Sequence, residues 1–204
     1  MPSLSLSFWH LDARLSGLTG VGNAALLDEP LTAFFASRTC PGSAIRAAMD
    51  WAVAEARSGR TIIGGFHSPL ERSVLEVLLA AHGRVVIALA RDVGKARLPN
   101  AWRQAALRGE IAVVSVTVSV TVSVTVSVTV SVTVSVTVSV TVSVTVSVTP
   151  NVKRLTGTLA RLRNDWISKL AASTVIAHAQ PGGQLEVDAM RWRNQGRKVN
   201  MLIE

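Results

Sequence analysis

The chain has 204 residues, of which 36 form a simple repeat, so 168 remain to build a folded core. That length suits one domain and is short for two. Lysine and arginine outnumber the acidic residues by 21 to 13, and the resulting net charge of +8 favours an anionic partner such as a nucleic acid or a nucleotide.

The cysteine count and the apolar patterning exclude several classes of protein. A single cysteine, Cys40, rules out an internal disulfide and fits a reducing cytosol. No His, Cys or acidic residues have the spacing of metal ligands, and no motif indicates a cofactor. The N-terminus lacks the basic segment and apolar run of a secretion signal, and no stretch is apolar for about 18 residues. We therefore expect a cytoplasmic protein with no membrane partner.

Residues 1–30 are expected to form a lead-in segment, with one short helix before residue 22 and a helical turn over 23–27. From residue 31 onward, short apolar runs alternate with helical patterns. The strand-like runs are 31–36, 61–63, 85–90, 111–116, 174–179 and 199–203, and the helical patterns are 45–56, 69–81, 100–108, 155–172 and 185–194.

Continuous apolar strands that alternate with helices are typical of a parallel sheet covered on both faces. The sequence therefore predicts an α/β fold: a Rossmann-like, doubly wound, mostly parallel sheet of about six strands. We expect one domain over residues 31–204, interrupted by the repeat as an insertion at 114–149. Ligands of such sheets bind beyond the carboxyl ends of the strands.

The turn after the second strand is the clearest candidate for a binding site. Gly64 and Gly65 open the turn, and the following helix has Ser68 as an N-cap, Pro69 at its first position and Glu71 as the partner in a capping box. Free backbone N–H groups at such a helix start can hold an anion. The same glycines also suit close packing of helix against sheet, so both interpretations stay open.

The repeat consists of nine copies of Val-Ser-Val-Thr over residues 114–149, followed by Pro150. Its period of two is typical of a strand, but a fully extended repeat would span about 120 Å and contains no turn residues. Hairpins of shifting register, an arm that pairs with another chain and a disordered loop remain open, and the composition is an aggregation hazard. We interpret the repeat as an expansion within a surface connection.

Four short segments at strand ends and in one helix carry a family resemblance. They are Ala36-Ser37-Arg38, the turn and helix start Gly64-Gly65-Phe66-His67-Ser68-Pro69-Leu70-Glu71, the helical triplet Arg163-Asn164-Asp165, and Pro181-Gly182-Gly183. In order and spacing they resemble the DNA-processing protein A family (DprA, also called Smf), within a superfamily shared with LOG-type nucleotide-binding proteins. The resemblance covers about residues 31–202 without the repeat. The chain departs from the family pattern at Ala36, where a glycine is usual, at Asp165, where a basic residue is usual, and in the second segment, which lacks that pattern's Arg and Asp.

The resemblance implies a non-enzymatic DNA-processing protein of DNA uptake and recombination, which binds single-stranded DNA or a nucleotide by its phosphates. It also allows a recombinase and a second copy of the chain as partners. No catalytic residue and no metal ligand are assigned. The candidate phosphate-binding residues lie at the expected carboxyl-end edge or in the family triplet, and they are Ser37, Arg38, Gly64, Gly65, His67, Ser68, Arg163, Asn164, Pro181, Gly182 and Gly183.

Several candidates also have ordinary structural explanations. Arg38 can pair with a nearby acid such as Asp28 or Glu29, and Arg163 can lie on a solvated helix face. His178, inside the fifth apolar run, is expected to be a packed core residue, and at least three of the five tryptophans are expected to be buried or half-buried.

Two other functions remain open. Pro181-Gly182-Gly183 resembles the start of the LOG motif Pro-Gly-Gly-x-Gly-Thr-x-x-Glu, which implies a phosphoribohydrolase of nucleoside monophosphates. However, Leu185, Glu186 and Ala189 stand where that motif has Gly, Thr and Glu. The remaining alternative is a module that senses a nucleotide ligand.

Overall fold

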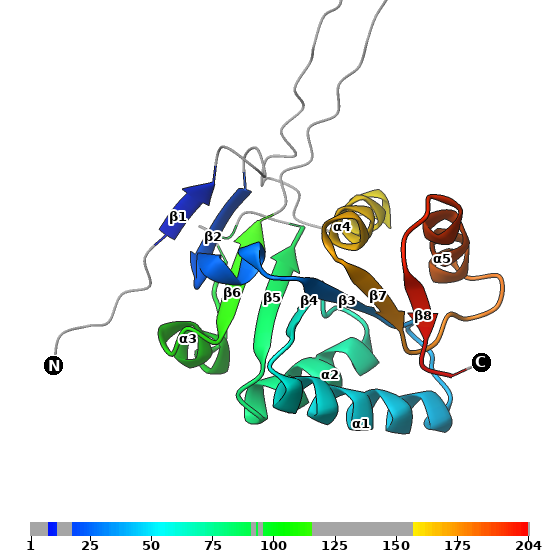
Figure 1. Cartoon of the computed structure of the whole chain (residues 1–204), viewed down its shortest axis with the longest axis horizontal. Coiled ribbons are helices and arrows are strands. Elements are labelled where there is room, and N and C mark those ends of the chain that lie inside the picture. Colours follow the sequence, from blue (N-terminus) through cyan, green and yellow to red (C-terminus); the bar gives the residue numbers. More distant parts are fainter. Residues whose placement is uncertain (1–7, 12–17, 91–92, 94–95, 116–156, 204) are drawn as a thin grey trace, which may run out of the picture.

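The computed structural model describes residues 8–11, 18–90, 93, 96–115 and 157–203, which form one eight-stranded sheet with helices on both faces (Figure 1). The strands are β1 (Phe8–Leu11), β2 (Leu18–Gly22), β3 (Leu31–Phe35), β4 (Thr61–Gly64), β5 (Arg84–Leu89), β6 (Ile111–Ser115), β7 (Ser173–Ile176) and β8 (Val199–Met201). The helices are α1 (Gly42–Ser58), α2 (Pro69–Ala80), α3 (Asn100–Leu107), α4 (Gly157–Leu170) and α5 (Gln184–Asn194), and a 3-10 helix η1 spans Ala24–Asp28.

The strand order is β1-β2-β6-β5-β4-β3-β7-β8, and the strands from β6 to β8 are all parallel to one another. From β3 the chain moves to β4, β5 and β6 on one side, and then returns to β7 and β8 on the other side of β3. The order of succession therefore reverses between β3 and β7, which makes this the topological switch point where open α/β sheets bind ligands. The predicted doubly wound α/β fold is confirmed, including all six predicted strands.

The lead-in segment differs from the expectation of a short helix, because residues 8–11 and 18–22 are strands. β1 and β2 form an antiparallel extension of the sheet beside β6. Gly20 allows this pairing, because a Cβ there would lie 2.4 Å from the ring of Trp9, and Gly22 has a φ of +91°. These glycines serve close strand packing. The predicted helical turn is confirmed as η1, whose N-cap Asn23 accepts a hydrogen bond from the amide of Ala25.

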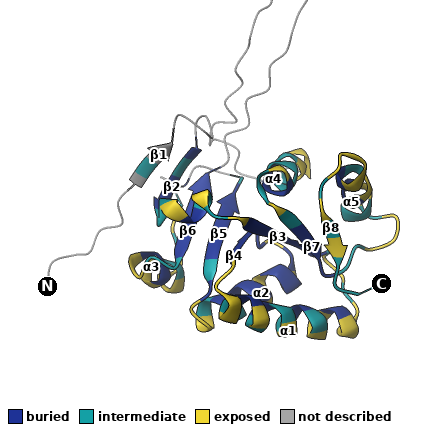
Figure 2. Cartoon of the chain, viewed as in Figure 1, coloured by how far each residue is buried: buried dark blue, intermediate teal, exposed yellow. Residues whose placement is uncertain are grey.

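The core lies in two layers, one on each face of the sheet. Ile62 and Ile63 are neighbours in β4 and both fully buried, yet they belong to different core clusters. Ile62 packs with side chains of α1, α2 and α3, whereas Ile63 packs with side chains of η1, α4 and α5. Figure 2 shows the resulting pattern of buried central strands and helices exposed only on their outer sides. Burial on both faces explains why the central strands are continuous apolar runs.

The tryptophans are packing residues, as expected. Trp192 is fully buried, with its ring 5.0 Å from that of Phe35, and Trp51 stacks on Phe34 at 4.8 Å. The other three tryptophans are half-buried. The ring contacts of Trp192 and Trp51 therefore hold α5 and α1 to β3.

Candidate functional site

The predicted binding segments meet at the carboxyl-end edge of three adjacent strands, β4, β3 and β7. The loop after β3 is hydrogen-bonded on both sides. On one side, the N–H of Ala36 donates to Glu71 Oε1 at 3.1 Å. On the other side, the N–H of Ser37 donates to the carbonyl of His178 at 3.0 Å, and the N–H of Gln180 donates to Ser37 Oγ at 2.8 Å. The strand ends that meet here, those of β3 and β7, form the topological switch point.

The backbone N–H groups at the start of α2 are hydrogen-bonded to the carboxylate of Glu71, a residue of the same helix. Ser68 Oγ accepts a hydrogen bond from the N–H of Glu71 at 3.2 Å. In return, Glu71 Oε2 accepts from the N–H groups of His67 at 2.7 Å and Ser68 at 3.1 Å, which confirms the predicted capping box. The backbone groups of His67 and Ser68 that were expected to attract a phosphate therefore already bind a carboxylate.

Arg163 of α4 lies beneath the β4–α2 turn. Arg163 is only 4% exposed. It therefore lies neither on a solvated helix face, as its ordinary structural explanation required, nor on the surface of the sheet edge. A Cβ on Gly65 would lie 2.5 Å from Arg163 Cζ, so the glycine makes room for the guanidinium. Burial lowers the pKa of Arg163, and the nearby negative charge of Glu71 opposes that shift.

The hydrogen bonds of Arg163 are incomplete. Nε and Nη2 donate to Asn164 Oδ1 at 3.2 and 2.8 Å, while Nη1 is buried with no partner among the residues that the structure describes. Asn164, the second predicted residue of this helix, therefore supports Arg163. Arg163 adds a positive charge under the turn, next to the buried Glu71.

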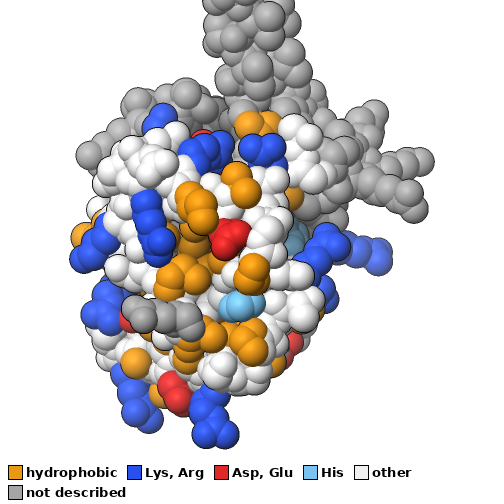
Figure 3. Space-filling view, turned by 90° about the vertical axis from the view of Figure 1, so that its right-hand side faces the viewer, with side chains coloured by type: hydrophobic (Ala, Val, Ile, Leu, Met, Phe, Trp, Pro, Cys, Tyr) orange, Lys and Arg blue, Asp and Glu red, His pale blue; other side chains and the backbone are white. Residues whose placement is uncertain are grey.

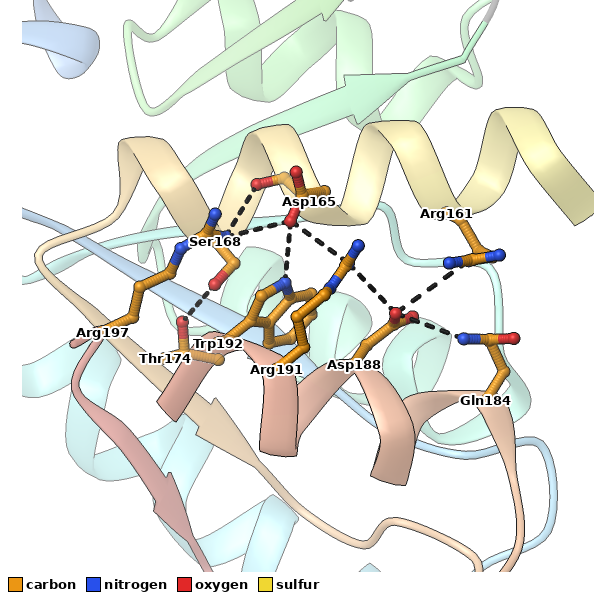
Figure 4. Close-up of polar contacts among 9 residues, drawn as sticks. All are labelled: Arg161, Asp165, Ser168, Thr174, Gln184, Asp188, Arg191, Trp192 and Arg197. Atoms are coloured by element: carbon orange, nitrogen blue, oxygen red, sulfur yellow. Dashed lines mark hydrogen bonds and ion pairs between the residues drawn. The ribbon is translucent and has the colours of Figure 1, made fainter. Parts of the chain in front are cut away.

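The third residue of the family triplet, Asp165, points toward α5 (Figure 4). Asp165 Oδ1 accepts hydrogen bonds from the Trp192 indole at 2.9 Å and from Arg191 and Arg197 at 3.2 Å each. The acid that replaces a basic residue of the family pattern therefore ties α4 to α5 and to the segment before β8. Sequence reasoning missed this role, because the three donors are far from Asp165 along the chain.

A second carboxylate strengthens the same helix pair. Asp188 of α5 is 2% exposed and accepts hydrogen bonds from Gln184 at 3.2 Å and from Arg191 at 3.1 Å. Arg161 of α4 approaches it to 4.0 Å (Figure 4). The arginines of this region thus have structural partners.

The start of α5 is the second predicted anion-binding site, and its backbone N–H groups are also hydrogen-bonded within the protein. The N–H of Gly182 donates to Glu186 Oε2 at 2.7 Å, and the N–H of Gly183 donates to the carbonyl of Gln180 at 2.9 Å. Gly182 has a φ of +71°, which explains the glycine without any ligand. Pro181 precedes it as an exposed turn residue. Both helix starts at this edge therefore present carboxylates where the sequence predicted anion-binding amides.

The accessible positive charge at the edge comes from side chains. Arg38 is exposed directly after β3 and makes no ion pair within the described part of the chain. The alternative explanation, a pairing of Arg38 with Glu29, does not hold, since Glu29 binds Arg84 and the Thr61 hydroxyl instead. Arg72, at the start of α2, is also exposed and donates to the carbonyl of His67 at 3.2 Å.

A hollow of about 530 Å³ opens beside the switch point, between the loops after β3 and β7 and the inner side of α5 and β8. His178 lines it and is half-exposed, so the prediction of a core histidine was wrong. β7 ends at Ile176, two residues before His178, and the apolar run alone could not show where the strand stops. Figure 3 looks onto the side of β8 and α5, where hydrophobic side chains gather around a histidine and an acidic side chain.

The described residues contain no group of three or more His, Cys, Asp or Glu side chains arranged to hold a metal ion. None of their helices is long and apolar enough to cross a membrane.

Comparison with known proteins identifies the fold. No protein-family model matches the sequence, and no curated protein matches it. Solved structures do match, among them the two that follow. DNA processing protein A from Helicobacter pylori, a protein described as binding single-stranded DNA, superimposes with a TM-score of 0.63 at 12% identity, over 98% of this chain and 81% of that one. DNA processing protein A from Streptococcus pneumoniae superimposes with a TM-score of 0.65 at 14% identity, over 97% of this chain and 63% of that one.

The present chain thus spans less than two thirds of the length of the pneumococcal protein. At these identities the likeness concerns the fold. The chain has the Rossmann-like fold of the DNA-processing protein A (DprA) proteins.

Proposed function

We propose that this chain is a DprA-like DNA-processing protein that binds single-stranded DNA, or a nucleotide, through phosphate groups at the carboxyl-end edge of its sheet. The observation that carries the proposal is the placement of Arg38. It lies at the topological switch point, its side chain is exposed, and it has no acidic partner among the described residues. A guanidinium in that position offers paired donors to phosphate oxygens.

The two capping glutamates determine how a phosphate would bind. Because Glu71 and Glu186 occupy the helix starts, the contacts come from cationic side chains, chiefly Arg38 and Arg72. Binding of this kind is driven by counterion release and depends little on base sequence. We therefore expect affinity for single strands that falls steeply with salt.

Two features favour binding over the phosphoribohydrolase alternative. Glu186 Oε2 is engaged with the amide of Gly182, and Ala189 is a buried alanine at the place of the catalytic acid in the LOG motif. The edge thus offers cations for phosphate and lacks that acid. A recombinase and a second copy of the chain remain proposed partners, which pull-down and light scattering would test.

Fluorescence anisotropy with a labelled single-stranded oligonucleotide tests the proposal. Arg38→Ala should weaken binding and reduce the slope of log K against log salt by about 0.7, the effect of one lost phosphate contact on a single strand. Arg57→Ala is the matched control, because Arg57 is also exposed but lies in the last turn of α1, at the opposite edge of the sheet. Absence of binding at low salt, or equal effects of the two substitutions, would contradict the proposal.

A further inference from the structure

The edge of the sheet at β8 has no neighbouring strand among the described residues. β8 is the last strand in the sheet order and pairs only with β7. The carbonyl of Lys198 and the N–H of Leu202 are hydrogen-bonded to β7, at 2.8 and 2.9 Å. Since successive residues of a strand turn their backbone groups to opposite edges, the N–H and carbonyl groups of Val199 and Met201 face the open side.

The hollow lies against this open edge. Met201, whose backbone groups face outward, lines it together with Ile203. Met190 lines it from α5 and is 55% exposed. Figure 3 looks onto this side of the molecule and shows hydrophobic side chains gathered there. An open strand edge beside an apolar hollow has both parts that recognition of an extended peptide uses, main-chain hydrogen bonds and a pocket for alternate side chains.

The available charges around this edge are positive. Arg193 lines the hollow, and Lys198 directly precedes β8. Both side chains are exposed, and neither makes an ion pair within the part of the chain that the structure describes. Glu186, the acid in the lining, is already bound to the N–H of Gly182 at 2.7 Å. A partner that carries acidic residues therefore complements this surface.

A second copy of the chain would meet the same surface less well. A two-fold interface brings the same patch of both copies together. Arg193 and Lys198 of one copy would then lie near those of the other, and like charges across an interface are unfavourable. The net charge of +8 on each chain adds to this repulsion. Charge complementarity thus favours an acidic partner over a second copy.

We propose that the β8 edge binds an extended, acidic peptide segment of another protein, which adds to the sheet as a strand beside β8. The outward backbone groups of Val199 and Met201 supply the main-chain hydrogen bonds. An apolar side chain of the peptide enters the hollow, where the flexible thioethers of Met190 and Met201 pack against it. Arg193 and Lys198 pair with the acidic residues of the peptide. This site is separate from the phosphate contacts proposed above.

Fluorescence anisotropy with labelled heptapeptides tests the proposal. All of them alternate valine with threonine, and they are flanked by aspartates in one peptide and by lysines in another. The full chain should bind the acidic peptide at least about ten-fold more tightly than the basic one. A third peptide has the acidic sequence with methylated backbone nitrogens and should not bind, because it cannot donate main-chain hydrogen bonds. A Kd above about 1 mM for the acidic peptide, or equal binding of its methylated form, would overturn the proposal.

Two pairs of variants locate the peptide on the protein. Val199→Pro removes an outward N–H and should weaken binding of the acidic peptide about ten-fold, while an edge strand tolerates proline where the N–H faces away from the sheet. Val199→Thr is its control, because it keeps the N–H and the β-branched shape. Arg193→Glu should also weaken binding. Its control is Arg103→Glu, which makes the same change of charge at an exposed position of α3. Thermal melts show whether each variant is folded, and the Arg193 pair decides if Val199→Pro is not.

Each remaining outcome has a defined meaning. If the two members of either folded pair bind the acidic peptide equally well, the peptide does not lie at the β8 edge and the proposal fails. A dimer in light scattering that Val199→Pro dissociates would assign this edge to a second copy instead. Oligonucleotide binding should be the same for Val199→Pro and the wild type, so the peptide test stands whether or not the chain binds single strands.

Discussion

Glycine shows how one residue type supports different interpretations in this chain. The sequence placed Gly64-Gly65 and Gly182-Gly183 at helix starts, where glycine suits either an anion or close packing. In the structure Gly65 makes room for the guanidinium of Arg163, and Gly182 adopts a positive φ. The capping box at Ser68 and Glu71 was predictable because its partners are three residues apart. The contact of Gly65 with Arg163 was not, because it joins residues that are distant in sequence.

The contact of Gly65 with Arg163 predicts how a single substitution changes the stability of the fold. Gly65→Ala should destabilise the fold by about 1–3 kcal/mol, since the new Cβ would displace a buried guanidinium or its helix. Gly42→Ala is the control, because no atom lies within 4 Å of the Cβ position there. Urea unfolding of both variants measures the difference, and equal stability of the two would show that Arg163 moves aside at little cost.

At the scale of elements, the pair α4 and α5 depends on polar contacts as much as on apolar packing. Asp165 Oδ1 accepts from the Trp192 indole and from two arginines (Figure 4). Asp165→Asn keeps an acceptor oxygen but removes the charge that balances Arg191 and Arg197. We expect a loss of about 1.5–3 kcal/mol, the range for hydrogen bonds to charged groups.

Asp50→Asn in α1 is the matched control for that substitution, because Asp50 is exposed and makes no ion pair or hydrogen bond with a described side chain. Denaturant unfolding compares the two variants. If Asp165→Asn is as stable as Asp50→Asn, the polar contacts seen between α4 and α5 do not hold the helices together.

The turn from α3 into β6 is predicted to depend on pH. Hydrogen bonding to Arg108, helped by His82, lowers the pKa of Glu110 against the opposing effect of burial. A carboxyl group with a lowered folded-state pKa stabilises the fold above its unfolded pKa, and this contribution is lost as the pH falls through the folded pKa. Acidification should therefore destabilise the wild type more than Glu110→Gln. Thermal melts from neutral to acidic pH measure this difference, and parallel curves would contradict it.

At the scale of the whole molecule, hydrophobic pattern sufficed for the fold but not for the site. Six strands and five helices were predictable because every central strand is buried on both faces and therefore reads as an apolar run. β1 and β2 were missed, and in β2 two glycines interrupt the apolar pattern. The hollow could not be predicted for another reason: its lining comes from the loop after β3 and the start of α1, the loop after β7, α5, and β8 with the residues that follow it. Only the tertiary fold brings these segments together.

The Val-Ser-Val-Thr repeat gives a prediction for the whole molecule. Except for Val114 and Ser115 at the end of β6, the repeat lies outside the described residues. We propose that it is an insertion within a single domain. Removing residues 118–149 would delete eight of the nine copies and leave nine residues, 116–117 and 150–156, between β6 and α4. Nine residues reach about 30 Å when extended.

The shortened chain should keep the unfolding midpoint and the oligonucleotide affinity of the full chain. β6 keeps its pairing with β5 and β2, and shortening the connection between β6 and α4 from 41 to nine residues favours folding by only about 1 kcal/mol. Its tendency to aggregate should fall, because an uncharged β-prone segment is removed. Thermal melts, anisotropy and light scattering measure these three quantities. A large drop in the midpoint, or loss of binding, would mean that the repeat belongs to the folded domain or to its binding surface.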